Sequence, residues 1–338
     1  VIVGCANPEG EQGLQVGRLI SARALGIEVP GITINRYCAS GLEAISMAVA
    51  KIKAGMGHVY IAGGTESMSL IPMTGYKLAP SYKANMENIN YHVSMGATAE
   101  AVAEKYNITR KEMDAFAVAS HAKALSATEK GYFKKEIIPL KGTDKNGNTV
   151  IHDKDEGIRP GTNMAALAKL PSMKKLQSGG KLDGMITAGL SSQICDGAAA
   201  IMIVNDAGLE KLGLNPRAKI ISLALAGDDP VIMLTGPIPA SKTVLEKADL
   251  SIEDIDLYEV NEAFAPVPLA WAHELKADKE KLNVNGGAMA LGHPLGGTGA
   301  KLMTTLLHEL ERREGKYGLQ AICEGGGTAN ALIIERLN

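Results

Sequence analysis

The chain has 338 residues, of which 46% are hydrophobic and 21% are charged, and its formal net charge is −2. This length allows two domains, and the composition is that of an ordinary globular protein rather than a disordered or fibrous one. The balanced charge gives no reason to expect a nucleic-acid partner, and no run of about 18 apolar residues predicts a membrane span.

Four cysteines are scattered along the chain without any Cys-x-x-Cys pair: Cys5, Cys38, Cys195 and Cys323. This pattern disfavours a disulfide framework or a structural zinc site. It is typical of a reducing compartment, so we expect a cytoplasmic protein.

The first candidate site is Cys38, which lies immediately ahead of a predicted helix. Ser40 followed by Glu43 is the pattern of a capping box. The apolar residues that follow have helical spacing: Leu42, Ile45, Val49 and Ile52. At a helix N-terminus the free N–H groups and the helix dipole favour a thiolate, which can hold an acyl group as a thioester. The alternative is that Cys38 is a small buried hydrophobic residue.

Two segments of the chain, one in each half, follow the same order of elements. In the first half, the cysteine-bearing turn leads into a helix, and a strand at 58–62 then ends in Gly63-Gly64-Thr65. In the second half, the Gly-rich turn 292–299 leads into a helix, and a strand at 319–323 is followed by Gly325-Gly326-Gly327-Thr328. Strands alternating with helices predict βαβ units and largely parallel sheets, hence an α/β fold with two duplicated halves.

A long insertion is expected in the first half. The strand 331–335 closes the second half directly, whereas its first-half counterpart, 198–204, lies far downstream of Gly64. The intervening segment has its own helix, capped by Thr109 and Glu112, and long insertions usually carry function. The predicted units are a first half of residues 1–66 plus 192–213, an inserted domain of residues 67–191, and a second half of residues 214–338.

The chain begins inside a predicted strand, Val1–Gly4, without Met or a signal peptide. The segment 218–247 of the second half has no counterpart in the first. We therefore expect that a first strand and helix are missing, and an organelle-import signal would lie in that missing part.

Three further residues lie where predicted strands and Gly-rich turns end. Asn261 comes at the carboxyl end of a strand, where ligands gather in open α/β sheets, although a turn-capping Asn fits the pattern equally well. His293 is held between Gly and Pro, which positions an imidazole for proton transfer or oxyanion binding. Cys323 ends a strand before three glycines, where a ligand can approach the backbone closely.

Taken together, four motifs resemble the active-site signatures of the thiolases, the acetyl-CoA acyltransferases, in order and in spacing. They are Cys38-Ala39-Ser40, Asn261-Glu262-Ala263-Phe264, Gly292-His293-Pro294 and Cys323-Glu324-Gly325. The resemblance covers essentially the whole chain. It implies a five-layer αβαβα fold with two βαβ halves and an inserted loop domain, and an absent N-terminal segment of about 40 to 55 residues.

The resemblance also implies catalytic roles. Cys38 resembles the nucleophile that becomes acylated, His293 the base that activates it, and Cys323 the acid/base at the substrate α-carbon. Asn261 resembles the residue that holds a catalytic water in a first oxyanion hole. The backbone N–H groups of Cys38 and Gly325 would form a second oxyanion hole.

The implied activity is CoA-dependent cleavage of a 3-ketoacyl-CoA to acetyl-CoA and a shortened acyl-CoA, with coenzyme A as a substrate, no permanently bound cofactor and no metal. Ser192 and Ala188 match the loop that contacts pantetheine, and Met233 matches a position that lines the pantetheine tunnel. The acyl chain would lie over Met95. The implied assembly is a homodimer or homotetramer, with a hydratase/dehydrogenase subunit as an optional partner.

Two residues depart from the family pattern. Leu190 replaces the usual Asn in the pantetheine loop. Within Tyr91–Gly96, Ser94 replaces the His of acetoacetyl-specific biosynthetic members, which favours the degradative branch and a longer acyl chain.

Three alternatives stay open: a biosynthetic acetoacetyl-CoA-forming acetyltransferase, a fatty-acid-type condensing synthase, and a catalytically silent lipid-binding member of the fold. A condensing synthase would carry His where this chain has Cys323. Several apolar residues of the insertion would line a subunit interface or pack in the insertion's own core: Met68, Leu70, Ile71, Met73, Leu78 and Met95.

Overall fold

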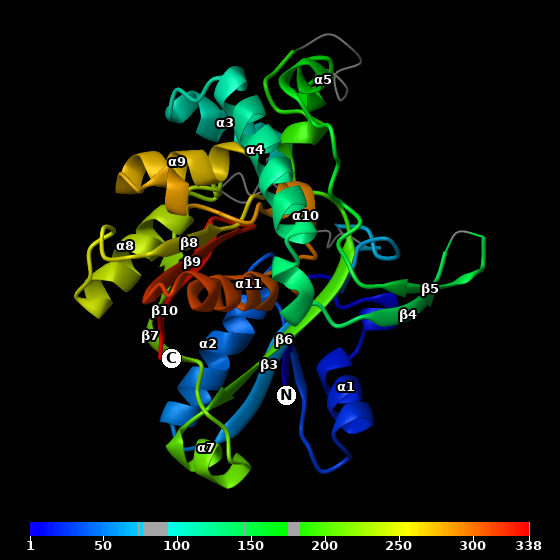
Figure 1. The fold of residues 1–338 in the computed structure, drawn as a ribbon, viewed down its shortest axis with the longest axis vertical. Coiled ribbons are helices and arrows are strands. Elements are labelled where there is room, and N and C mark those ends of the chain that lie inside the picture. The colour runs from blue at the N-terminus through cyan, green and yellow to red at the C-terminus, as the bar shows by residue number, and fades with distance from the viewer. Residues whose placement is uncertain (74, 77–93, 145, 175–182, 338) are drawn as a thin grey trace, which may run out of the picture.

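The framework of the protein is a pair of four-stranded sheets (Figure 1). The computed structural model describes residues 1–73, 75–76, 94–144, 146–174 and 183–337. In sheet order, the first sheet contains β2 (Ile32–Ile34), β1 (Ile2–Gly4), β3 (Val59–Ser67) and β6 (Asp196–Val204). The second contains β7 (Ala218–Gly227), β10 (Thr328–Arg336), β9 (Tyr317–Glu324) and β8 (Leu257–Val260).

The pairing of β3 with β6 joins strands from the two sides of the insertion. Val59 lies opposite Val204 and Ser67 opposite Asp196, in antiparallel register. This confirms the prediction that the two strands share a sheet, while the domain boundaries drawn around them stay a prediction.

The expectation of largely parallel sheets is wrong for the second sheet. There β10 runs antiparallel to both β7 and β9, and the parallel pair is β8 with β9. The chain reverses between β9 and β10 through Gly326 and Gly327, whose φ angles are +80° and +77°. A connection this short joins antiparallel neighbours, since a parallel pair needs a long crossover.

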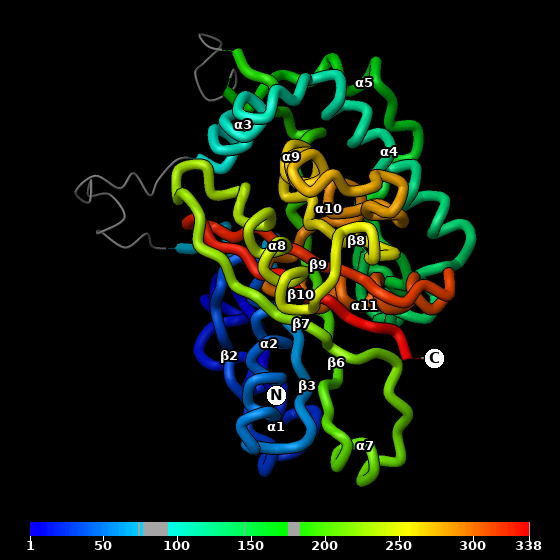
Figure 2. Tube along the Cα trace, turned by 90° about the vertical axis from the view of Figure 1, so that its left-hand side faces the viewer, coloured from blue at the N-terminus to red at the C-terminus, as the bar shows by residue number. Residues whose placement is uncertain are grey.

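Helices form three layers around the two sheets, which gives the expected αβαβα order (Figure 2). In the central layer, α11 (Thr298–Arg313) contacts α2 (Ser40–Lys53) and strands of both sheets. In the outer layers, α1 (Val16–Ala24) packs on β1 and β2, and α8 (Pro237–Ala248) packs on β7 and β10. A Cβ on Gly299 would lie 2.0 Å from the Leu42 nitrogen, so glycine is required where α11 and α2 meet.

The segment between β3 and β6 forms a helical cap with a protruding hairpin (Figure 1). Its elements are α3 (Met95–Lys105), α4 (Arg110–Glu129), the hairpin β4 (Leu140–Thr143) and β5 (Thr149–His152), α5 (Met164–Ala168), and the short 3-10 helices Tyr132–Lys135 and Ala188–Leu190. The Thr109–Glu112 capping box of α4 is confirmed. Helix α3 contacts α9 (Pro266–Leu275) and α4 contacts α10 (Ala288–Leu291), so the insertion packs on the second half.

The apolar residues of the insertion divide between its core and its surface. Met68 and Ile71 are buried, whereas Leu70 and Met73 are 55% and 50% exposed. Leu78 lies outside the described residues. The remaining elements are α7 (Asp206–Leu212) and the 3-10 helices Gly10–Gln12 and Lys279–Lys281. Among the described residues, no helix is both long enough and apolar enough to cross a membrane.

The capping box predicted at Ser40 and Glu43 is wrong. Ala39 is the N-cap of α2 and makes no side-chain cap bond. The Ser40 hydroxyl instead donates to the Tyr37 carbonyl at 2.6 Å and accepts from the Arg36 N–H at 2.8 Å. Glu43 turns away from the helix N-terminus and pairs with Arg36 at 3.2 Å. Both side chains therefore fix the turn that carries Cys38.

A partly buried carboxyl outside the site makes stability depend on pH. Burial raises the pKa of Glu136 from 4.5 to about 7, against a hydrogen bond from Thr305. The folded state therefore holds a proton that the unfolded state loses above pH 4.5, so this group's contribution to stability falls as pH rises through 7. We expect Glu136→Gln to raise the free energy of unfolding by at most about 3 kcal/mol at pH 8 and to have no such effect at pH 4. Urea unfolding of both proteins at pH 4 and pH 8 tests this prediction. An equal change in the free energy of unfolding at the two pH values would contradict it.

Candidate active site

The four polar residues singled out from the sequence lie at the ends of elements that converge on the central helix layer. Cys38 directly precedes α2, and His293 lies in the turn between α10 and α11. Asn261 follows β8, and its N–H donates to the Ala321 carbonyl of β9 at 3.0 Å, close to Cys323. All four are less than 9% exposed. Because β8 and β9 are parallel neighbours, their carboxyl ends place Asn261 and Cys323 at the same sheet edge.

Hydrogen bonds indicate the tautomer of His293, and burial keeps its ring neutral. The Thr298 hydroxyl donates to the Pro294 carbonyl at 2.9 Å, so toward His293 it can only accept. His293 Nδ1, at 2.6 Å from that hydroxyl, is therefore the N–H donor, and Nε2 carries the lone pair. Burial lowers the pKa of His293 to about 3, so the imidazole is neutral at physiological pH. A neutral imidazole whose Nε2 carries a lone pair is equipped to accept a proton.

Asn261 lies beside that lone pair. Its Nδ2 is 3.3 Å from His293 Nε2. Its Oδ1 is buried and has no hydrogen-bond partner among the residues that the structure describes. A buried acceptor without a partner is costly, and a bound water or a polar substrate group would satisfy it.

Cys38 is a thiol in the resting protein, contrary to the thiolate expected from its place before a helix. Burial raises its pKa to about 12, and the charge of Glu324 adds to the effect. Hydrogen bonds from the backbone N–H groups of Cys38 and Gly325 oppose the shift but are outweighed. Desolvation of a fully buried sulfur therefore exceeds the helix-terminus effect, and ionisation requires a base.

Cys323 belongs to the same microenvironment. Burial and the neighbouring Cys38 raise its pKa well above the ordinary value, so it too is a thiol at rest. The Gly325 turn that follows it packs against Tyr37, because a Cβ on Gly325 would lie 3.5 Å from the Tyr37 ring. The turns that carry the two cysteines are thus in contact.

Glu66 is a residue that the sequence argument missed. It is 1% exposed, and its carboxylate accepts from the N–H groups of Ala6 and Gly296, each at 2.8 Å. It also accepts from the Asn7 N–H at 3.1 Å and the Gln12 side chain at 2.5 Å. Gly296 belongs to the turn that follows His293, so Glu66 ties that turn to the first sheet. Its place after Gly63-Gly64 was the only signal in the sequence.

We expect Glu66→Gln to separate positioning from ionisation. The new amide would place N–H groups against backbone N–H donors and displace the His293 turn, which should lower kcat by about 10²-fold. The charge of Glu66 also raises the pKa of Cys38. Its removal should therefore speed alkylation of Cys38 by iodoacetamide at pH 8. Slower alkylation of Cys38 together with a lower kcat would contradict this separation of the two effects. The matched control is Glu311→Gln, which changes a carboxylate outside the site.

The predicted CoA-contacting residues lie along an apolar cluster that reaches Cys323. Met233 is buried in this cluster, and Met95 packs against it half-buried. The Ser192 N–H donates to the Ala263 carbonyl at 2.9 Å, which holds the loop beside the Asn261 segment. Ala188 is exposed at the start of the 3-10 helix Ala188–Leu190.

Both departures from the family pattern have local explanations. Leu190 is fully buried in the same cluster, and its carbonyl accepts from the Ala265 N–H at 2.9 Å. Ser94 is the N-cap of α3 and accepts from the Ala97 N–H at 3.3 Å. The preceding residues of that motif, including His92, lie outside the described residues. In the part of the chain that the structure describes, no group of His, Cys, Asp and Glu side chains could hold a metal ion.

Comparison with known families and proteins gives consistent matches along the chain. The family model described as "Thiolase, N-terminal domain" matches residues 1–207, and "Thiolase, C-terminal domain" matches residues 214–336. A 3-ketoacyl-CoA thiolase of Bacillus subtilis is 45% identical over 99% of this chain and 86% of its own length. The steroid 3-ketoacyl-CoA thiolase FadA6 of Mycobacterium tuberculosis is 44% identical over 100% of this chain and 83% of its own.

A solved structure agrees with these matches. The crystal structure of human mitochondrial 3-ketoacyl-CoA thiolase superimposes with a TM-score of 0.89 and 38% sequence identity. The superposition covers 99% of this chain and 87% of the human one.

Proposed function

This chain belongs to the thiolase family, and we propose that it cleaves 3-ketoacyl-CoA with coenzyme A through a thioester on Cys38. The products are acetyl-CoA and an acyl-CoA shortened by two carbons, and the reverse reaction is a Claisen condensation. The protein is accordingly an acyltransferase of fatty-acid-type CoA metabolism. The observation that carries the proposal has two parts: the buried Cys38 and Cys323 thiols share one environment, and the neutral His293 pairs with Asn261, which lies at the same sheet edge as Cys323.

In the first step Cys38 attacks the keto carbon while its proton passes to His293 Nε2. The bond between the α- and β-carbons then breaks, the acyl group stays on sulfur, and the electron pair leaves as the enolate of acetyl-CoA. Protonated Nε2 and a water on Asn261 Oδ1 donate to the enolate oxygen. Each such donor is worth roughly 3 kcal/mol in acyl-transfer enzymes.

In the second step Cys323 gives its proton to the enolate carbon and releases acetyl-CoA. The resulting thiolate takes the proton of incoming coenzyme A, whose sulfur attacks the acyl group. The backbone N–H groups of Cys38 and Gly325, which already donate toward the Cys38 sulfur, would hold the oxyanion of that tetrahedral intermediate. Cys38 leaves and recovers its proton from His293, so the cycle balances.

The acyl chain would extend over methionine side chains. Met95, Met173 and Met185 pack against the cluster that contains Met233 and Cys323. Unbranched thioether side chains adapt to ligands of different length. We therefore propose medium or long 3-ketoacyl chains rather than acetoacetyl-CoA alone, with pantetheine between Met233 and the Ala188–Ser192 loop.

Thiolysis of 3-ketoacyl-CoA substrates of increasing length tests this function, followed as loss of the enolate absorbance. We expect kcat/KM to be higher for chains longer than acetoacetyl. Cleavage restricted to acetoacetyl-CoA would favour the biosynthetic alternative. Binding of acyl-CoA without cleavage of any substrate would favour a catalytically silent lipid-binding protein.

We further propose a homodimer or dimer of dimers. Support comes from apolar side chains exposed near the first sheet's free edge, with Leu14 at 91% and Ile27 at 74% exposure. An obligate interface buries about 2,000 Å² or more, which would cover such residues. Sedimentation at micromolar concentration should show at least a dimer, and a fully active monomer would contradict this.

The proposed compartment is the cytoplasm, because all four cysteines are free thiols, as a reducing environment maintains them.

A further inference from the structure

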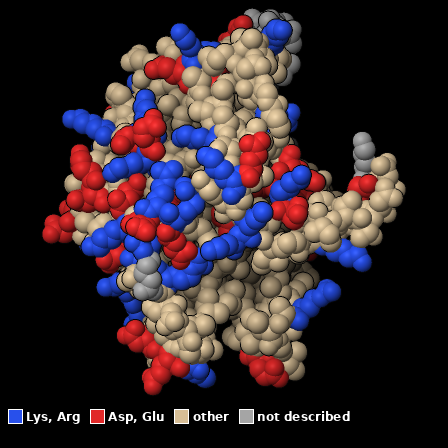
Figure 3. All heavy atoms as spheres, in the orientation of Figure 1, with Lys and Arg blue, Asp and Glu red and all other residues tan. Residues whose placement is uncertain are grey.

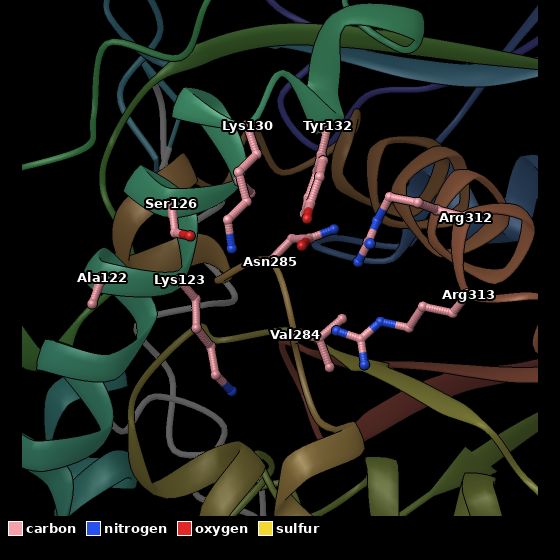
Figure 4. Close-up of a pocket in the computed structure, with 10 residues that line it drawn as sticks. Ala122, Lys123, Ser126, Lys130, Tyr132, Val284, Asn285, Arg312 and Arg313 are labelled. Carbon is pink, nitrogen blue, oxygen red and sulfur yellow. The ribbon is translucent and has the colours of Figure 1, made fainter.

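A cavity of about 360 Å³ lies away from the cysteines, between the second half of α4 and the last turn of α11. Figure 4 shows the side chains that line it. Lys123 and Ser126 come from α4, Lys130 is the C-cap of that helix, Tyr132 follows it, and Arg312 and Arg313 end α11. Val284 and Asn285 form the floor between them. The cavity is therefore built jointly by the insertion and the second half.

The lining is strongly basic. Lys130, Arg312 and Arg313 direct their nitrogens toward the cavity, whereas Lys123 extends along its edge (Figure 4). None of the lining residues is acidic. Glu309, behind the wall, pairs with both arginines. Four cations and one carboxylate leave a net charge of +3. On the face drawn in Figure 3, Lys and Arg side chains gather near the centre, in the region of α4 and α11, with acidic side chains among them.

The arginines alone have a structural explanation, because cations in a last turn stabilise a helix and Glu309 neutralises part of their charge. Lys130, the C-cap of α4, shares this explanation, but Lys123 lies inside α4 and does not. The two lysines are seven residues apart, which places them on one face of the helix. Lys123 donates one hydrogen bond, to the Leu282 carbonyl at 3.0 Å. The Lys130 Nζ lies 5.8 Å from the centre of the Tyr132 ring. The Arg312 Cζ lies 3.9 Å from the same ring centre.

We propose that this cavity binds a small soluble anion carrying two or more phosphate groups. Guanidinium and ammonium groups converging from two helices suit phosphate oxygens, and the Ser126 and Tyr132 hydroxyls can add donors. The volume lies at the small end of ligand pockets, which suits a compact anion rather than an extended polymer. None of the CoA-contacting residues named above lines the cavity.

Binding here has a direct connection to the catalytic site. The anion would sit at the C-terminal end of α11, whose first residue, Thr298, accepts the His293 Nδ1 hydrogen bond. The two ends lie about 22 Å apart along the helix. The site is thus placed to act on His293 through one rigid element, although the binding proposal does not depend on the proposed reaction.

The test is isothermal titration of the full-length protein with inorganic pyrophosphate, using the wild type, Lys130→Gln, Lys123→Gln and Lys211→Gln. Lys211 lies on α7, outside the cavity, and is the matched charge control. We expect saturable binding, about tenfold weaker in each cavity variant because each loses a charge-assisted hydrogen bond, and unchanged in the control. Lys130→Gln is the decisive variant, since Lys130 is exposed and its loss leaves the packing intact.

Three outcomes would overturn the proposal. They are no saturable binding at physiological ionic strength, equal weakening in Lys211→Gln and Lys130→Gln, and competition by coenzyme A that marks the CoA site as the place of binding. None of these readouts involves thiolysis, so the proposed function can fail without affecting this test.

Discussion

Replacing Cys38 with Ala should abolish thiolysis, lowering kcat by at least about 10⁴-fold. In the proposed mechanism the thioester step has no other nucleophile, because the second thiol, Cys323, lies at the end of β9 and transfers a proton. The measurement is steady-state thiolysis of the best 3-ketoacyl-CoA substrate, with circular dichroism to confirm folding.

The matched control is Cys195→Ala, a half-buried cysteine with no assigned role, which should retain nearly full activity. If Cys38→Ala kept more than a few per cent of the wild-type rate while Cys195→Ala lost it, the nucleophile would have been misassigned.

The second large effect should distinguish Cys323 from His293. Cys323→Ala should still accept an acyl group from acyl-CoA on Cys38, yet fail to exchange the α-proton of acetyl-CoA with solvent deuterium. His293→Ala should slow acylation itself, by about 10² to 10⁴-fold, because the buried Cys38 thiol then lacks the base that we propose for it.

Single-turnover acylation and deuterium exchange measured on both variants separate the roles. Equal and full acylation in both variants would remove the basis for calling His293 the base. Normal exchange in Cys323→Ala would show that another group moves the α-proton.

Local sequence patterns predicted the helices and strands well, but they predicted the hydrogen-bond partners of side chains poorly. Thr109–Glu112 and Ser40–Glu43 have the same capping-box spacing, yet only the first pair forms one. The Ser40 hydroxyl instead donates to the Tyr37 carbonyl, and the Glu43 carboxylate pairs with Arg36. Tertiary partners that sequence spacing does not reveal therefore decided the outcome.

The protonation state of Cys38 could not be predicted from the sequence for a similar reason. The position before a helix was visible in the sequence and favours a thiolate. Complete burial, which depends on how both halves enclose the turn, raises the pKa instead. The role of Glu66 was equally hidden, because its bond to Gly296 joins residues 230 positions apart. The repeat itself predicted the β3–β6 pairing, since the order of strands is encoded locally in each half.

The central claim, an acyl group carried on Cys38, is tested most directly by peptide mass analysis. The protein is incubated with an acyl-CoA, quenched in acid, digested and measured. We predict that the peptide containing Cys38 gains the mass of one acyl group, and that Cys38→Ala removes the label. A label on the peptide containing Cys323 or Cys195, with Cys38 unmodified, would contradict the claim.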